Sequence, residues 1–276
     1  MSDSKPKTSK APSVKEIRHK MEVPMLIVSF LLTLTFVALA LILKTNLGKD
    51  MGNLALAALF SPIMAFFYIR FGYWKEISNA VEINEDQMPD IYNHYSDVAK
   101  KMGMKEIPRL YLSNGNGSMN AYAAKCTVRR KYVVIYSDIV DLAYEMNDMS
   151  AVRFVLAHEL GHIYCGHVSL WRMFISTIPS ILMIGGNLSR AQEYSADRCG
   201  SYFVPEGAES ILALFAGKRT YKKVNMDAYL KSVKNHKPGF WFFIANFLSS
   251  HPVGFRRVEA LSKVKKQGWD INGKLF

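Results

Sequence analysis

Two long apolar runs near the start of the chain predict membrane helices. Val23–Leu43 contains no charged residue, and Leu54–Ile69 continues into a string of aromatic residues that ends at Trp74. A helix of about 20 apolar residues crosses the ~30 Å hydrocarbon layer of a membrane, and aromatic rings collect at its boundaries. Because the connector is short, we expect residues 23–74 to form a transmembrane helical hairpin. The alternative for each run is a core helix of a soluble protein.

Basic residues near these runs predict the orientation of the hairpin. Residues 1–22 form a basic tail with six lysine and arginine residues, whereas the connector carries only Lys44 and Lys49. Positively charged segments stay on the cytoplasmic side of a membrane. We therefore expect a flexible tail over 1–22 and a multi-pass protein of the inner (cytoplasmic) membrane, with everything after residue 75 on the cytoplasmic side.

The pattern after the second run is that of a soluble α+β domain. Amphipathic spacing predicts a helix over residues 86–102, and another helix begins at Ser137. Short β-branched and aromatic stretches predict strands, namely 109–112, 121–125 and 132–136. The order is one helix, a few strands, then mostly helices, which is typical of an α+β fold.

The segment Ser150–His167 carries the chemistry of a metal site. Its apolar residues recur at helical spacing, and Ser150 is a candidate N-cap. Within it lies His158-Glu159-Leu160-Gly161-His162, the H-E-x-x-H pattern. Histidines four residues apart share one helix face, so both imidazoles can bind one Zn²⁺. The Glu159 carboxylate lies about 100° around the helix, where it can act as a general base.

A catalytic zinc site needs a third protein ligand, and a second acidic pair supplies a candidate. Glu193 and Asp197 are also four residues apart. Glu193 is the candidate third ligand. Asp197 either accepts a hydrogen bond from a ligating imidazole or holds the two helices together. By itself this pair would indicate a solvated helix face, and only the upstream histidines change that interpretation.

Four segments together resemble the M48 family of zinc metallopeptidases and, with the N-terminal hairpin, its HtpX-like branch. In chain order they are Asn120-Ala-Tyr-Ala123, the H-E-x-x-H helix, Glu193-Tyr-Ser-Ala-Asp197 and Ser250-His-Pro252. The resemblance spans about residues 81–261. It implies that residues 75–276 form a mainly helical, gluzincin-like metalloprotease domain with a small β-sheet.

The resemblance also implies roles for residues outside the metal ligands. Asn120, Ala121, Tyr122 and Ala123 would belong to an edge strand that pairs with an extended substrate; main-chain pairing of this kind binds many sequences. His251 would stabilise the oxyanion, and Arg257 would be a structural ion-pair partner. Without the resemblance, residues 120–123 suggest an ordinary core strand and His251 a histidine at a helix start.

Two features depart from the family pattern. Val253 stands where the family usually has a second proline, and no full membrane hairpin separates the two metal helices. Only residues 173–185 are apolar there, too few to span a bilayer. Residues 239–248, rich in Phe and Trp, follow a lysine-rich stretch. Both segments are candidates for insertion into an anionic membrane surface, with core helices as the alternative.

Charge and cysteine content agree with these predictions. The 276 residues are 50% hydrophobic and carry a formal net charge of +12. Two membrane runs favour a lipid surface over nucleic acid as the partner of this charge. Three cysteines without C-x-x-C spacing form no disulfide framework and no zinc ribbon, and they fit a reducing compartment.

The sequence therefore predicts a membrane-anchored, zinc-dependent endopeptidase with one Zn²⁺ per chain. It would hydrolyse membrane or membrane-proximal proteins, including misfolded ones. The alternative is a non-proteolytic membrane adaptor with a structural zinc, which would need a fourth protein ligand such as His167. A prenyl-protein protease is disfavoured, because the chain is short for the many-helix chamber of that branch.

Overall fold

The computed structural model describes residues 12–43, 49–127, 130–181, 185–217, 219–235, 239–249, 251–267 and 271–275. Its helices are α1 (Val14–Ile17), α2 (Glu22–Leu43), α3 (Lys49–Ile77), α4 (Pro89–Lys101), α5 (Ser137–Met146), α6 (Ser150–Tyr164), α7 (Leu170–Ile181), α8 (Gly186–Phe203), α9 (Ala213–Ala216), α10 (Met226–Asn235), α11 (Phe240–Leu248) and α12 (Gly254–Gln267). Two 3₁₀ helices, η1 (Pro205–Leu212) and η2 (Tyr221–Lys223), and four strands, β1 (Val81–Ile83), β2 (Arg109–Ser113), β3 (Ala121–Lys125) and β4 (Lys131–Tyr136), complete the described elements. The mainly helical α+β class is confirmed.

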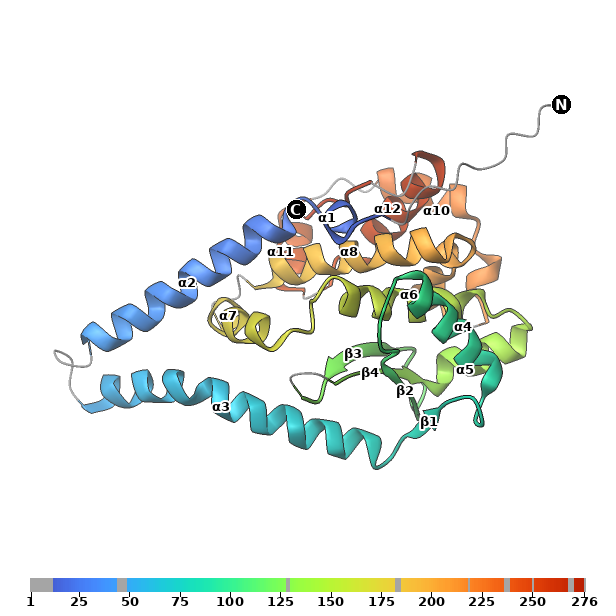
Figure 1. The fold of residues 1–276 in the computed structure, drawn as a ribbon. Helices are drawn as coiled ribbons and strands as arrows, with labels where there is room; N and C mark the ends of the chain where they lie inside the picture. The colour runs from blue at the N-terminus through green and yellow to red at the C-terminus, as the bar shows by residue number, and fades with distance from the viewer. Residues whose placement is uncertain are drawn as a thin grey trace.

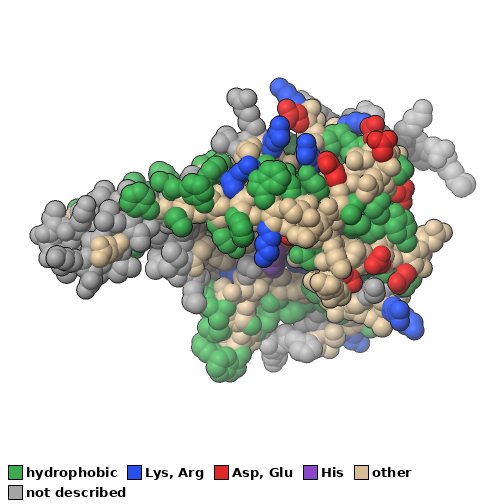
Figure 2. Space-filling model, turned by 90° about the horizontal axis from the view of Figure 1, so that it is seen from below, with side chains coloured by type: hydrophobic (Ala, Val, Ile, Leu, Met, Phe, Trp, Pro, Cys, Tyr) green, Lys and Arg blue, Asp and Glu red, His purple; other side chains and the backbone are tan. Residues whose placement is uncertain are grey.

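Helices α2 and α3 project from the body of the molecule (Figure 1). Among the described helices, α2 alone is long and apolar enough to cross a membrane, over Glu22–Leu39. Figure 2 shows hydrophobic side chains along this projecting part, whereas charged side chains gather over the body. One of the two expected spans thus meets the criteria of length and composition.

The described part of the expected flexible tail is instead docked on α8. Ile17 is fully buried, and the backbone N–H of His19 donates to Ser195 Oγ at 2.9 Å. Arg198 of α8 donates to the carbonyl oxygen of Glu16 at 2.8 Å. The expectation for residues 12–22 was wrong, because lysine content suggested solvation while buried contacts order the segment. Residues 1–11 of that tail lie outside the described residues.

A four-stranded sheet in the order β1-β2-β4-β3 provides one wall of the body. Strand β4 pairs parallel with β2 and antiparallel with β3, which places β3 at an edge. Alternate residues point to opposite faces: Val133 and Ile135 enter the main core, while Tyr132 and Val134 pack with Tyr73 at the end of α3. The three expected strands are confirmed, and the short β1 was not foreseen.

The main core lies between this sheet and the helix layer built from α6 and α8 (Figure 1). Helix α6 is buried on nearly all sides. Its apolar residues Val152, Leu156 and Leu160 are almost completely unexposed. Its neighbours are α8, η1, α4 and β3. A helix enclosed in this way holds its side chains in fixed positions, which suits a site that needs defined geometry.

The two short apolar segments form helices with different surroundings. Most of the segment 173–185 lies in α7, which packs beside α2, where Thr33 Oγ1 donates to the Ile175 carbonyl at 2.9 Å. Residues 182–184 lie outside the described residues. Residues 239–248 form α11, whose Phe240 and Trp241 are 68% and 79% exposed. Phe242 stacks on Phe255 of α12, but the exposure of Phe240 and Trp241 argues against the core-helix alternative for α11.

Candidate metal centre

Helix α6 positions the three residues of the H-E-x-x-H pattern. His158 and His162 are one turn apart on the same face, and His158 and Glu159 are each only 7% exposed. Ser150 is not the N-cap that the sequence suggested, since the helix begins at Ser150 itself. Its backbone N–H donates at 3.0 Å to Asp148 Oδ1, so Asp148 satisfies the helix start.

Helix α8 brings Glu193 to this face because the two helices approach closely. A side chain at Gly161 would place its Cβ 2.7 Å from the Cβ of Cys199 on α8. Only a residue without a Cβ permits this spacing, which explains the glycine inside the pattern. The close approach lets the Glu193 carboxylate reach across to both histidines.

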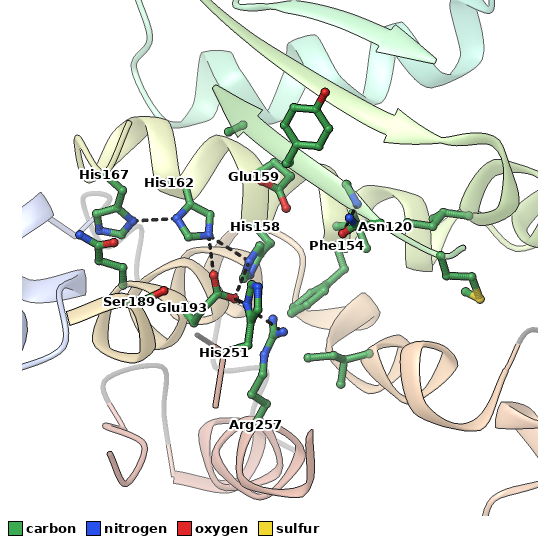
Figure 3. A pocket seen from close by; sticks show the side chains of 18 of the residues that line it. Asn120, Phe154, His158, Glu159, His162, His167, Ser189, Glu193, His251 and Arg257 are labelled. Atoms are coloured by element: carbon green, nitrogen blue, oxygen red, sulfur yellow. Dashed lines mark hydrogen bonds and ion pairs between the residues drawn. The ribbon is translucent and has the colours of Figure 1, made fainter. Parts of the chain in front are cut away.

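The ligand atoms of His158, His162 and Glu193, which we call the donor triangle, all lie within 4.8 Å of one another, and each histidine faces a different oxygen of Glu193 (Figure 3). Nε2 of His162 lies 3.2 Å from Nε2 of His158 and 3.4 Å from Oε1 of Glu193. Nε2 of His158 lies 3.5 Å from Oε2 of Glu193. Ligands bound tetrahedrally at 2.0–2.1 Å from Zn²⁺ lie roughly 3.3 Å from one another. These residues therefore fit a zinc ion with one coordination position left open.

Asp197 makes both contacts that the sequence left as alternatives. Its Oδ1 lies 2.9 Å from Nδ1 of His158, which turns Nε2 of that ring toward the donor triangle. The same carboxylate accepts two hydrogen bonds from Arg257 of α12, at 2.9 and 2.7 Å. Arg257 also approaches Glu193 at 3.6 Å. The Asp197 carboxylate thus both orients the ligand His158 and attaches α12 to α8.

Electrostatics in the site favour a cation. Burial by itself would raise the pKa of Glu193, but contacts with three histidines hold it well below its ordinary value. Burial would also raise the pKa of Asp197, which Arg257 and His158 lower. Against the effect of burial, the two carboxylates raise the pKa of His158 to about 10. A divalent cation would replace that proton, because both offset the same buried negative charge.

The donor triangle opens into a cavity of about 330 Å³. Ten of the eleven residues singled out from the sequence line it, namely Asn120, Ala121, Tyr122, Ala123, His158, Glu159, His162, Glu193, His251 and Arg257. The eleventh, Asp197, is 2% exposed and contacts His158 beside the cavity. Glu159 is outside the donor group, and its carboxylate is directed toward the cavity (Figure 3).

His251 approaches the site from the segment between α11 and α12. Its Nδ1 lies 3.1 Å from Glu193 Oε2, which raises the pKa of the imidazole, and its side chain is 63% exposed. An exposed ring beside a buried ligand can face a substrate in the cavity. The preceding residue of the motif, Ser250, lies outside the described residues.

Residues that the sequence did not indicate complete the cavity. Met119, Phe154 and Ile211 provide apolar walls, while Ser189 and Gln192 of α8 add polar groups. Gln192 directly precedes Glu193, but nothing in the pattern distinguishes it from a surface glutamine. His167 also borders the cavity, yet its ligand atoms do not belong to the donor triangle. The closed four-ligand site of the adaptor alternative is therefore not formed with His167.

Two histidines on one buried helix, a glutamate from a second helix and a further carboxylate lining the same cavity define a metallopeptidase type of site. The sequence model of the family described as "Peptidase family M48" matches residues 85–186 and 169–265, which together make up more than half of the chain. The chain therefore belongs to peptidase family M48, a family of metallopeptidases. It is also similar to the plastoglobule-localized metallopeptidase 48, chloroplastic, of Arabidopsis thaliana, with 24% identity over 200 residues. That match covers 66% of this chain and 54% of the plant protein, so the chain spans about half the length of this relative.

Proposed function

We propose that this protein is a zinc-dependent endopeptidase anchored in a membrane. The observation that carries the proposal is the donor triangle of His158, His162 and Glu193, which shares one cavity with the free carboxylate of Glu159. Zinc supplies a Lewis acid that polarises a carbonyl and lowers the pKa of water. His158, His162 and Glu193 would hold it, and Asp197 and Arg257 keep the ligands in place.

The roles of the remaining residues follow from their positions in the cavity. Glu159 takes a proton from the attacking water and later passes it to the leaving amine, as a general base and then acid. His251 donates to the developing oxyanion from the exposed side of Glu193. Strand β3 lies at the sheet edge along the same cavity. Its free edge binds the substrate backbone as an additional strand, which presents the peptide bond in extended form.

Replacing Glu159 by Gln tests the mechanism. General acid–base catalysis contributes about 10²–10⁴-fold, so Glu159→Gln should lower the rate of casein cleavage by that factor while the protein still binds zinc. Glu193→Gln should instead reduce zinc binding itself, as measured by metal analysis. Glu85→Gln, at an exposed position on the body, serves as the matched control. Equal activity of Glu159→Gln and the wild type would disprove the assignment.

We further propose that α2 and α3 form the expected transmembrane hairpin in an inner (cytoplasmic) membrane, with the protease domain on the cytoplasmic side. Helix α3 exposes large apolar side chains that water would not favour, among them Met64, Phe67 and Phe71 at 63–68%. Arg70 and Trp74 lie at the end of this apolar stretch, as is typical of a membrane boundary. The basic residues of the N-terminal segment support the cytoplasmic orientation.

Membrane-proximal proteins are the proposed substrates, because the cavity continues toward the projecting helices. A second cavity of about 330 Å³ shares Ala123, His167 and Gln192 with the first. It follows the end of β3 and reaches Ile69 of α3 and Ser176 of α7. An extended segment leaving the bilayer beside α3 could therefore reach the metal centre along β3. This path would have lipid at one end and the peptide-binding edge of β3 at the other. It therefore favours unfolded or extracted membrane segments as substrates.

Helix α11 supplies a direct test of membrane proximity. Its exposed Phe240, Trp241 and Phe243 would insert into the interface. With Trp74, Trp171 and Trp269 replaced by Phe, the full-length protein keeps Trp241 as its one fluorophore of this type. Brominated acyl chains in a nanodisc should quench its emission. Emission unaffected by brominated lipid would contradict insertion of α11 and leave the peptidase assignment intact.

A further inference from the structure

A buried carboxylate at the start of the apolar helix α2 lies close to the metal site. Glu22 is the first residue of α2 and is fully buried. The mechanism above does not use it, and the sequence pattern did not indicate it. Its only signal in the sequence is an acidic residue directly before an apolar run, a position where it would ordinarily be solvated.

Four groups surround the Glu22 carboxylate, two as hydrogen-bond donors and two within ion-pair distance. Arg172 of α7 donates to Oε1 at 2.9 Å, and Arg18 Nε lies 3.4 Å from the same atom. Ser195 of α8 donates to Oε2 at 2.6 Å. The fourth group is His167, whose Nε2 lies 3.2 Å from Oε2, within ion-pair distance. A carboxylate restrained on both oxygens cannot rotate away, so it presents a fixed acceptor to His167.

His167 connects this carboxylate to a zinc ligand. Its Nδ1 lies 2.9 Å from Nδ1 of His162, and this pair shares one hydrogen bond (Figure 3). The other nitrogen of His162, Nε2, belongs to the donor triangle. The chain of contacts therefore runs from Glu22 through His167 and His162 to the metal position.

When His167 is neutral, the proton positions along this chain have one consistent arrangement. A carboxylate only accepts, so it selects the His167 tautomer that carries its proton on Nε2. Nδ1 of His167 is then an acceptor and selects the His162 tautomer protonated at Nδ1. That tautomer leaves the Nε2 lone pair of His162 free for a metal. Asp197 performs the same task for His158 by direct contact, so the two histidine ligands have separate supports.

We propose that Glu22, acting through His167, is a positioning residue that fixes the tautomer and orientation of His162 and so raises the zinc affinity of the site. The inference rests on the proposed metallopeptidase function. It also means that the docking of the N-terminal segment and the strength of metal binding are coupled. Helix α2 thereby contributes one group to the site in addition to its membrane role.

A double-mutant cycle on zinc affinity tests this proposal. Zinc affinity is measured on purified full-length protein, stripped of metal, by competition with a chromogenic chelator. Mutating a residue that supports a metal-bound histidine from behind typically lowers metal affinity about 10–100-fold. Glu22→Gln and His167→Leu should therefore each weaken zinc binding by that factor. In the His167→Leu background, Glu22→Gln should have almost no further effect. A purely structural Glu22 would cost the same in both backgrounds.

Controls separate folding from positioning. Glu16→Gln makes the same substitution at an exposed carboxylate of the N-terminal segment and should keep the wild-type affinity. Circular dichroism confirms that each variant is folded, and His167→Leu provides a second variant should Glu22→Gln not fold, because it leaves the arginine contacts of Glu22 intact. Additive effects, or wild-type affinity in His167→Leu, would overturn the inference alone. A wild-type protein that binds no zinc would overturn the proposed function with it.

Discussion

Helices α8 and α2 invert the usual distribution of polar and apolar residues in opposite ways. Helix α8 buries polar and charged side chains, and Arg190, Glu193 and Asp197 are at most 5% exposed. Helix α2 exposes apolar ones, and Ile27 and Leu34 are 54% and 55% exposed. Both arrangements are unfavourable for an ordinary soluble protein. Each becomes favourable with a specific partner, which is a cation for α8 and lipid for α2.

A hydrogen bond between buried side chains joins the two helices. Ser195 of α8 donates to Glu22 at the start of α2. On the α8 side of this contact, Glu193 and Asp197 form ion pairs with histidines and Arg257. On the other side, α2 leaves the body with few polar side chains. Glu22 lies at this boundary. It is both a buried charged group of the body and the first residue of the apolar helix α2.

The largest expected effect comes from breaking the buried charge balance of α8. Arg257→Met removes the arginine partner of Asp197 and Glu193, and removing one partner of a buried pair costs about 3–5 kcal/mol. The free energy of unfolding in detergent, with chelator present, should fall by that amount. Arg256→Met changes the neighbouring residue, which is only partly buried, and should cost clearly less. Equal losses for the two variants would contradict a special role of the α8 charge network.

A charge on the apolar surface of α2 should have the next largest effect. Leu34→Arg places a charged side chain in the middle of the proposed span, which costs about 2.5–3.5 kcal/mol of membrane insertion. The fraction of protein that resists carbonate extraction should fall. Val81→Arg alters a residue that is 43% exposed but lies on the sheet, so it should leave insertion unchanged. Normal insertion of Leu34→Arg would argue that α2 is not in contact with lipid.

The smallest effect is expected where polarity and exposure agree. Asp148 is partly exposed and accepts from Ser150 at the start of α6, and these hydrogen bonds lower its pKa. Asp148→Ala should reduce the free energy of unfolding by about 1 kcal/mol.

The pH dependence of this effect follows from the direction of the shift. A carboxylate with a lowered folded-state pKa stabilises the protein above its ordinary pKa of about 4, and the stabilisation is lost as the pH falls through the folded value. The difference between Asp148→Ala and the wild type should therefore be constant near pH 7 and shrink below about pH 4. A difference that grows in acid would contradict this assignment of the helix start.

Local patterns predicted much of this protein. Hydrophobic periodicity predicted α4, α5, α6 and three of the four strands, because side-chain spacing alone distinguishes helix from strand. The i, i+4 spacing of His158 and His162 was sufficient to predict that their imidazoles share a face. Spacing within one helix is set by helix geometry, so no tertiary information was needed.

Contacts between distant segments were decided only by the tertiary structure. The close passage of Gly161 against Cys199 carries Glu193 to the histidines, and the parallel pairing of β2 with β4 leaves β3 at the edge. Residues 12–22 looked like a solvated tail until buried ion pairs placed Glu22 beside His167. A pattern along the chain reports which side of an element is apolar. It does not report which buried polar groups find each other, because those partners come from segments that are adjacent only after folding.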